Sequence, residues 1–382
     1  MRLNPILDEV GTYPFVRIED AKRRAAAAGI RIIDFGVGDP REPTAPFIRQ
    51  ALADGIRETM GYPRAIGLPE LRDAIAAWAR ARFSIDLDGE TEVIPTLGSK
   101  EAIFSLAQVV VDRDAGRDLV VTTEPGYPVA ERGARFAGAD VLRLPLLEQN
   151  GYLPDLDAVD DATWRRTAIL WLNYPNNPTG ACAPLDLYER AAELAERHDF
   201  LVASDEAYSE LFFAEPPASA LQVDRRERVV AVNSLSKRSS MTGYRSGFVA
   251  GSRPVLDALR SFRPWVGSAP QEFVQRAAVA AWSDEAHVAE TRARYARKRA
   301  PFLDLLARKG LRVSGSEATM YLWVATPDGA SSEDFAVRLL ERGVVVAPGA
   351  ALGPSGEGYV RLALVPTESD CADACAILEE IL

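Results

Sequence analysis

The sequence predicts an α/β fold, in which a large domain with a mostly parallel sheet covered by helices is accompanied by a smaller α+β domain. From about residue 45, helical stretches alternate with short apolar runs bounded by turn signals, a pattern typical of parallel strands joined by crossover helices. The chain has 382 residues, more than one hydrophobic core usually supports. We therefore expect two domains.

The large domain is expected over residues 45–270. Its clearest helix is amphipathic, because Leu71, Ile75 and Trp78 recur at helical spacing. Apolar runs predict buried strands at 120–122, 168–172, 201–203 and 229–232, and a further strand is expected within 245–251.

The smaller domain is expected to combine residues 1–44, an N-terminal arm, with residues 271–382. Residues 254–309 are predicted to be mostly helical, with a break near 267–270. The rest of the chain predicts strands at 321–324, 344–346 and 359–362, a helix over 332–342 and a last helix from Glu368. No internal repeat or low-complexity linker interrupts this order.

Composition disfavours several classes of partner. The chain carries 44 Lys plus Arg against 55 Asp plus Glu, and its net charge of −11 repels nucleic-acid phosphates and anionic lipid. No stretch approaches the roughly 20 consecutive apolar residues of a membrane span. The start shows no secretory signal and the three cysteines are sparse. We expect a cytoplasmic protein without nucleic-acid or membrane partners.

Several site motifs fail. The segment Gly36-Val-Gly38 begins like a dinucleotide fingerprint, but Arg41 stands where the third glycine is needed. No Gly-Lys dipeptide supports a phosphate loop, and no serine has the flanking glycines of an esterase. The two histidines are too few for a multi-histidine metal site; we expect His198 to end a helix and His287 to face solvent or a helix contact. No metal is expected.

Polar residues follow each of the predicted parallel strands. These polar ends are residues 123–127, 173–177, 204–208 and 233–237. Because ligands of open α/β sheets bind beyond the carboxyl ends of the strands, the four ends predict one common site.

Lys237 is the strongest candidate for chemistry in this site. It closes the run Ser234-Leu-Ser236-Lys237, and Arg245 follows eight residues later. Schiff-base chemistry needs a partly neutral lysine, and a neighbouring cation lowers a lysine pKa while hydroxyls and Arg neutralise a phosphate. An exposed lysine in a polar loop is the alternative for such a run alone.

Other strand ends supply what a pyridine ring needs when it acts as an electron sink. Such a ring requires a carboxylate that keeps its nitrogen protonated and donors to its 3-oxygen. Asp205, Tyr208 and Asn177 meet this specification. Singly, Asp205 could cap a helix and Asn177 could begin a turn.

Together these motifs resemble those of the fold-type-I pyridoxal-phosphate aminotransferases of class I and II, from Leu3 to about Val365. The resemblance implies a seven-stranded sheet and pyridoxal 5′-phosphate as cofactor. It makes Lys237 the Schiff-base lysine and the acid and base of catalysis, with Asp205 and Tyr208 beside it. The implied phosphate-binding residues are Ser99, Lys100, Ser234, Ser236 and Arg245.

The same resemblance assigns further residues. Tyr127 is similar to the aromatic residue that stacks on the cofactor ring, and Tyr62 to the tyrosine that reaches the neighbouring subunit's cofactor, which implies a homodimer. Arg361 matches the arginine that binds the substrate carboxylate bidentately. The remaining implied substrate-binding residues are Gly38, Asn177 and Tyr13.

Several stretches resemble most closely the N-succinyl-diaminopimelate aminotransferases, among them SLSKRSSMTGYRSGFVAG and QRAAVAAWSDEAHV. This resemblance implies glutamate as amino donor and N-succinyl-2-amino-6-oxopimelate as keto acid, in lysine and diaminopimelate biosynthesis. The alternatives are a broader glutamate, aspartate or aromatic transaminase, or a lyase on the same fold. Candidates for the far end of the substrate are Lys100, Arg64 and Arg17.

Overall fold

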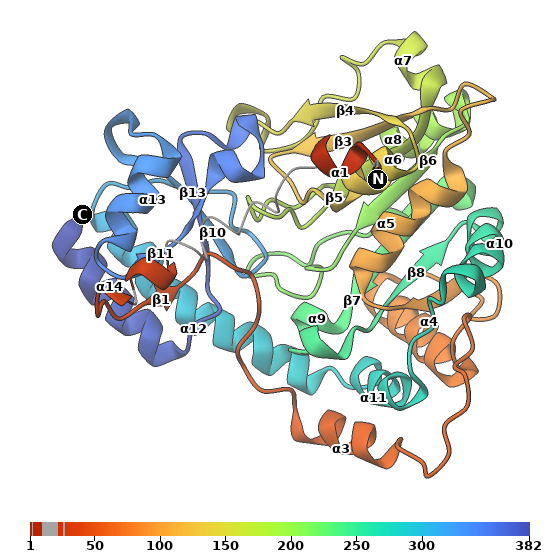
Figure 1. Ribbon diagram of the computed structural model, residues 1–382, viewed down its shortest axis with the longest axis horizontal. Helices are drawn as coiled ribbons and strands as arrows, with labels where there is room; N and C mark the ends of the chain where they lie inside the picture. Colours follow the sequence, from red (N-terminus) through yellow and green to blue (C-terminus); the bar gives the residue numbers. More distant parts are fainter. Residues whose placement is uncertain (2, 10–21, 26) are drawn as a thin grey trace.

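The computed structural model describes residues 1, 3–9, 22–25 and 27–382, arranged as two lobes (Figure 1). Tyr13 and Arg17 lie outside the described residues. Over the described part of the chain, no helix has the length and apolar character needed to cross a membrane.

The larger lobe is built on a seven-stranded sheet, as the sequence predicted. All neighbouring strands are parallel except at β8, which runs antiparallel to both of its neighbours. In spatial order the strands are β2 (Val93–Thr96), β8 (Gly247–Gly251), β7 (Val229–Ser234), β6 (Leu201–Asp205), β5 (Thr167–Asn173), β3 (Leu119–Glu124) and β4 (Asp140–Pro145).

Helices cover both faces of this sheet, so its central strands are apolar on both sides. In β5, Ile169 and Trp171 pack on one face while Leu170 and Leu172 pack on the other, as alternating side chains must. The first face is covered by α5 (Ser99–Val110), α6 (Val129–Phe136) and α10 (Arg253–Phe262). The second is covered by α3 (Pro46–Asp54), α4 (Pro69–Phe83), α7 (Asp161–Arg166), α8 (Leu185–His198) and α11 (Glu272–Trp282).

The smaller lobe has its own sheet and core. Its antiparallel sheet runs in the order β12 (Ala347–Pro348), β13 (Tyr359–Ala363), β10 (Tyr321–Ala325) and β9 (Val313–Ser314). A two-stranded parallel pair joins β1 (Ile33–Asp34) to β11 (Val344–Val345). Helices α12 (Ala286–Arg308), α13 (Ser332–Leu340) and α14 (Glu368–Ile381) pack on these strands, and the short α1 spans Ile6–Glu9.

The division at residue 270 stays a prediction. Helix α11, beyond that residue, packs against α3 and α4 and contributes Trp282 to the core of the larger lobe. Helix α12 then runs from the larger lobe to the smaller one, where Phe302 and Leu305 enter the second core (Figure 1). We propose that the division lies within α12.

Candidate active site

A cavity of about 840 Å³ lies where the two lobes meet, at the carboxyl ends of the parallel strands. The predicted residues that line it are Gly38, Ser99, Lys100, Tyr127, Asn177, Asp205, Tyr208, Ser234, Ser236, Lys237, Arg245 and Arg361. Tyr62 is fully exposed and does not line the cavity. Tyr13 lies outside the described residues.

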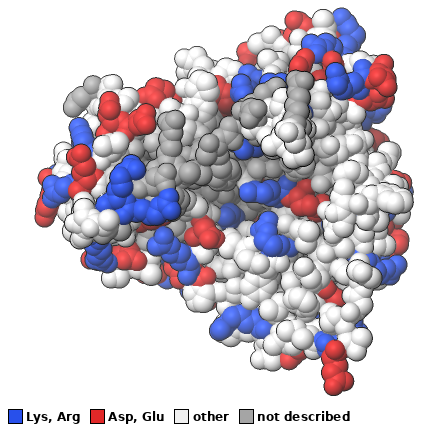
Figure 2. Space-filling model, in the orientation of Figure 1, with Lys and Arg blue, Asp and Glu red and all other residues white. Residues whose placement is uncertain are grey.

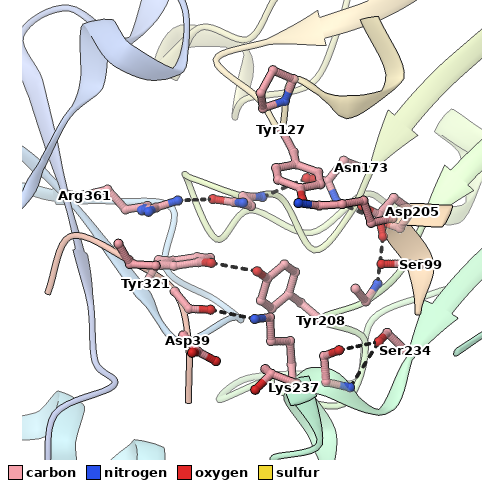
Figure 3. A pocket seen from close by; sticks show the side chains of 18 of the residues that line it. Asp39, Ser99, Tyr127, Asn173, Asp205, Tyr208, Ser234, Lys237, Tyr321 and Arg361 are labelled. Atoms are coloured by element: carbon pink, nitrogen blue, oxygen red, sulfur yellow. Dashed lines mark hydrogen bonds between the residues drawn. The ribbon is translucent and has the colours of Figure 1, made fainter. Parts of the chain in front are cut away.

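The sheet brings these side chains together because three adjacent parallel strands end at the same edge. Asn173 ends β5, Asp205 ends β6 and Ser234 ends β7. Directly after β7, the short helix α9 (Leu235–Arg238) carries Lys237 into the cavity (Figure 3). The topology therefore places the candidate nucleophile next to the candidate ring-binding carboxylate.

Lys237 has the properties of an amine nucleophile. Its Nζ donates a hydrogen bond of 2.6 Å to the carbonyl oxygen of Gly38. Burial lowers the pKa of Lys237 to about 8, although the charges of Asp39 and Asp205 oppose the shift. A lysine with such a pKa is neutral in a substantial fraction of molecules at neutral to mildly alkaline pH, as Schiff-base formation requires.

Asp205 is buried at the end of β6, with 7% of its surface exposed. One carboxylate oxygen accepts a hydrogen bond of 3.2 Å from the Ala207 amide. Burial raises the pKa of Asp205 to about 6, against the Ala207 amide and the charge of Lys237. A cationic ring nitrogen facing this carboxylate would restore its charged form, so Asp205 suits the role of ring partner.

One corner of the cavity is arranged to hold an anion. The Ser234 hydroxyl donates to the Ser236 hydroxyl at 2.8 Å, and α5 directs its first amides into the cavity from Ser99. The Arg245 guanidinium donates to the Leu97 carbonyl at 3.0 Å. At Gly98, with φ +77°, a Cβ would stand 2.5 Å from Arg245 Nη2, so a side chain here would strain the backbone and displace the guanidinium.

These residues fit pyridoxal 5′-phosphate. The corner supplies hydroxyls, helix amides and a guanidinium for the phosphate, while Asp205 supplies an anion for the ring nitrogen. Tyr127 offers an aromatic face and Lys237 an amine for the carbonyl carbon. When bound, the cofactor supplies an electron sink for carbanion chemistry at the substrate Cα.

Arg361 lies on the smaller-lobe side of the cavity. It is 2% exposed and stands in β13 opposite Trp323 of β10. Its Nη1 donates to Asn177 Oδ1 at 2.8 Å and its Nη2 to the Gly36 carbonyl at 2.8 Å. Both interactions join segments far apart in the sequence and hold the planar group ready for a carboxylate.

A network behind α9 holds it through three buried side chains, those of Ser239, His287 and Arg238. The Ser239 hydroxyl lies 2.8 Å from His287 Nε2, and His287 Nδ1 lies 2.7 Å from Asp284 Oδ1. Arg238 donates to Glu285 at 2.5 Å and its guanidinium covers the Trp282 ring at 4.4 Å. His287 is therefore buried in a contact between elements and does not face solvent.

Sequence reasoning gave no role to several residues of the cavity. Tyr321 places its hydroxyl 2.7 Å from that of Tyr208, and Asn173 donates to the Asp205 carbonyl at 3.0 Å (Figure 3). Asp39, Arg23 and Thr242 also line the cavity. Asn173 was recognised as a polar strand end but had no role of its own, and Asp39 could have been found by its place beside Gly38. Tyr321 begins an apolar strand whose pattern signals only packing.

Comparison with known proteins gives consistent matches. The profile of the family described as aminotransferase class I and II matches residues 30–378. The LL-diaminopimelate aminotransferase of Dehalococcoides mccartyi is 38% identical over 375 residues, which cover 96% of each chain. That of Aquifex aeolicus is 38% identical over 363 residues, covering 93% of each.

Solved structures agree with this result over nearly the whole chain. A probable N-succinyldiaminopimelate aminotransferase from Thermus thermophilus superposes with a TM-score of 0.89 at 33% identity, covering 97% of this chain and 100% of that one. A mutant aspartate aminotransferase from the same organism reaches 0.92 at 30% identity, covering 100% of both chains. The family match, the seven-stranded sheet and a cavity that fits the cofactor converge on one conclusion: the chain belongs to the fold-type-I aminotransferases of class I and II, which depend on pyridoxal phosphate.

Proposed function

We propose that this aminotransferase exchanges an amino group between glutamate and a keto acid of the diaminopimelate series, with N-succinyl-2-amino-6-oxopimelate as the preferred acceptor. Relatives with 35–38% identity are named LL-diaminopimelate aminotransferases, and one similar structure is described as a probable N-succinyldiaminopimelate aminotransferase. Both names refer to the same seven-carbon skeleton. We propose that the enzyme acts in lysine biosynthesis.

The observation that carries the choice of acceptor is a group of cations in which Lys100 and Arg245 line the cavity and Arg132 lies close to Lys100. Burial lowers the pKa of Lys100, and the charges of Arg245 and Arg132 act in the same direction. Like charges gather here although the whole chain has a net charge of −11. Figure 2 shows Lys and Arg side chains around the hollow between the lobes. The far half of the succinylated substrate carries two carboxylates and no ammonium group, which suits such a site.

Within this proposal the residues have distinct tasks. Arg361 would bind the α-carboxylate, and Lys237 would move the proton at Cα of the substrate. Asp205 would hold the ring nitrogen, and Tyr208 would donate to the 3-oxygen of the ring. Lys100 binds a carboxylate at the far end of the substrate. It lies on the first turn of α5, with its Nζ 5.7 Å from the centre of the Tyr127 ring.

Free LL-diaminopimelate is the second candidate substrate. The names of the relatives favour it, and so does Asp39, an exposed carboxylate at the cavity that could receive the far ammonium group. The two candidates differ in charge at the far end, because the free compound carries one carboxylate and one ammonium group there.

Two measurements test the proposal. Single-turnover reactions of the cofactor-loaded enzyme would compare four amino donors: N-succinyl-diaminopimelate, free LL-diaminopimelate, aspartate and phenylalanine. The highest kcat/KM is expected for N-succinyl-diaminopimelate. Lys100→Ala should then raise KM for the succinylated keto acid more than for pyruvate, because pyruvate has no far carboxylate. Lys309→Ala, which removes a lysine that binds Glu379 on the smaller lobe, is the control.

The outcomes separate the candidates. Preference for free LL-diaminopimelate would establish the second candidate, and preference for aspartate or phenylalanine would overturn the diaminopimelate assignment. Equal losses for both keto acids in Lys100→Ala would place Lys100 in cofactor binding alone.

We also propose that the active form is a homodimer. Tyr62, in the segment between α3 and α4, is fully exposed, and Trp265 is 89% exposed. A groove of about 620 Å³ between α5, α6 and α10 is lined by Leu7, Phe104, Phe136 and Val266, which suits burial by a second copy of the chain. Tyr62 would then reach the partner subunit's cofactor.

A further inference from the structure

Tyr321 contacts several residues of the active site but has no task in the function proposed above. It is the first residue of β10 in the smaller lobe, is 3% exposed and lines the cavity. Its hydroxyl lies 2.7 Å from the hydroxyl of Tyr208, which follows β6 of the larger lobe (Figure 3). The two rings meet edge to face, with centroids 5.4 Å apart. This hydrogen bond joins the two lobes inside the cavity.

The ring of Tyr321 also touches Arg361. The guanidinium carbon lies 4.4 Å from the ring centroid, within the range of a cation–π contact. Asn177 and the Gly36 carbonyl accept hydrogen bonds from Arg361 at its two terminal nitrogens, each of which carries two N–H groups. Two hydrogen bonds and one ring face therefore fix the orientation of the guanidinium plane.

A third contact involves Gly38. A Cβ added to Gly38 would stand 2.2 Å from the Tyr321 hydroxyl, so the tyrosine occupies the space that any side chain at position 38 would fill. The Gly38 carbonyl in turn accepts the hydrogen bond from Lys237. Tyr321 thus helps to define the loop that touches the nucleophilic amine.

The backbone before β10 is strained in a way that places Tyr321. Thr319 has φ +73°, which is rare for a β-branched residue, and it is completely buried. Its amide donates to the Leu211 carbonyl at 2.5 Å, and its hydroxyl accepts from the Tyr321 amide at 3.1 Å. Leu211 lies three residues after Tyr208. The strained turn therefore anchors the start of β10 to the same turn that carries Tyr208.

We propose that Tyr321 is a positioning residue for transamination, with two separable tasks. Its hydroxyl donates to Tyr208 and so directs the single phenolic proton of Tyr208 toward the 3-oxygen of the cofactor. Its ring holds the Arg361 plane in the orientation that receives the α-carboxylate. Hydrogen bonds in a chain polarise one another, so donation from Tyr321 makes Tyr208 a stronger donor. The inference rests on the roles proposed above for Tyr208 and Arg361.

Two substitutions separate these tasks. Tyr321→Phe removes the hydroxyl and keeps the ring, whereas Tyr321→Leu removes both. Tyr359→Phe is the control, because Tyr359 lies in β13, next to β10, but its hydroxyl donates to Glu148 and it does not line the cavity. Melting curves of all three variants report whether the fold is retained.

Tyr321→Phe should change the spectrum of the bound cofactor. A hydrogen bond from Tyr208 to the 3-oxygen of the cofactor would favour the form of the bound cofactor in which the lysine nitrogen has lost its proton. A weaker hydrogen bond should therefore raise the pH midpoint of the visible absorbance by a few tenths of a unit. We expect kcat to fall roughly tenfold, as for one weakened hydrogen bond. Affinity for maleate, a dicarboxylate that does not react, should change less than about twofold because the ring under Arg361 remains.

Tyr321→Leu should show the same change in midpoint and should also weaken maleate binding by about tenfold, through loss of the ring. If Tyr321→Phe matches Tyr359→Phe in midpoint and kcat while Tyr208→Phe raises the midpoint, the proposed task of the hydroxyl is overturned and the role of Tyr208 stands. If Tyr208→Phe does not move the midpoint either, both are overturned. Unchanged maleate affinity in Tyr321→Leu would overturn the task of the ring.

Discussion

Lys237 differs from an ordinary surface lysine in its surroundings. It is carried by a helix of only four residues, its amine is hydrogen-bonded to a backbone carbonyl, and burial lowers its pKa to about 8. These properties match an amine that must be neutral in order to attack a carbonyl carbon.

We therefore predict that Lys237→Ala abolishes transamination and covalent attachment of the cofactor while the fold is retained. Borohydride reduction followed by peptide mass spectrometry measures the attachment, and circular dichroism measures the fold. A reducible adduct found on another lysine of the variant would contradict this assignment.

Asp205 illustrates a conflict between stability and function in the cofactor-free protein. Burial raises its pKa from an ordinary 3.8 to about 6, so above that pH the folded chain holds a carboxylate that water would solvate better. At about 1.4 kcal/mol per pKa unit, the shift corresponds to about 3 kcal/mol. The free energy of unfolding of the cofactor-free protein falls by this amount as the pH rises from about 4 through about 6.

Asp205→Asn should consequently stabilise the cofactor-free protein by about 1–3 kcal/mol at pH 7.5 while it slows transamination by orders of magnitude. Urea denaturation at several pH values measures the stability. The gain should be smallest near pH 4, where the unfolded chain also holds the proton. A gain independent of pH, or normal turnover, would show that Asp205 is not the strained partner of the ring.

At the scale of elements, α9 depends on neighbours outside the cavity. The Ser239 hydroxyl lies against His287, which Asp284 holds in turn, and Ser239 is only 3% exposed. Both segments belong to stretches whose sequence resembles the N-succinyl-diaminopimelate aminotransferases. The network joins the segment that carries the nucleophile to α12.

Ser239→Ala should weaken both the fold and the cofactor site. It leaves His287 Nε2 without its hydroxyl partner in a buried place, which costs about 1–3 kcal/mol of unfolding free energy. Thr291→Ala is the control, because the Thr291 hydroxyl binds the His287 carbonyl within α12 and does not touch α9. Equal cofactor affinity in the two variants would show that the network does not position Lys237.

Sequence alone predicted the central strands of the large sheet, which are buried on both sides, but not β2, although its four residues are also buried. Strands β5, β6 and β7 form uninterrupted apolar runs with polar ends, and both features follow from their central place in a parallel sheet. Strand β4 was not predicted, because it lies at the sheet edge and most of its residues are exposed or half-buried. Two-residue strands such as β9 and β12 are too short for any periodicity.

In the site as well, some residues could be predicted from local sequence and others could not. Side chains at strand ends could be predicted, because parallel strands bring their carboxyl ends together. The contact of Arg361 with Asn177 joins residues 184 positions apart, and that of Tyr321 with Tyr208 joins residues 113 apart. Family resemblance supplied the role of Arg361, whereas no local pattern marks Tyr321. Such contacts depend on how the lobes pack.

At the scale of the whole molecule, the proposed dimer places Tyr62 in the active site of the partner subunit. Within its own chain, Tyr62 does not line the cavity. Lys237→Ala and Tyr62→Ala should each be inactive or strongly impaired alone. When the two variants are mixed and allowed to exchange subunits, each mixed dimer should contain one site with both residues intact. Recovered activity would support the dimer, whereas an active enzyme that sediments as a monomer would contradict it.

The central claim is that one cofactor, held by Lys237, moves an amino group reversibly. The most direct test is a titration of the purified, cofactor-loaded protein with glutamate, followed by absorbance and by quantification of 2-oxoglutarate. We predict that the absorbance of the Lys237-bound cofactor disappears as one 2-oxoglutarate forms per chain, and that added 2-oxoglutarate restores it. Absence of spectral conversion with glutamate and every other amino acid tried, or release of ammonia in place of amino transfer to the cofactor, would contradict the account.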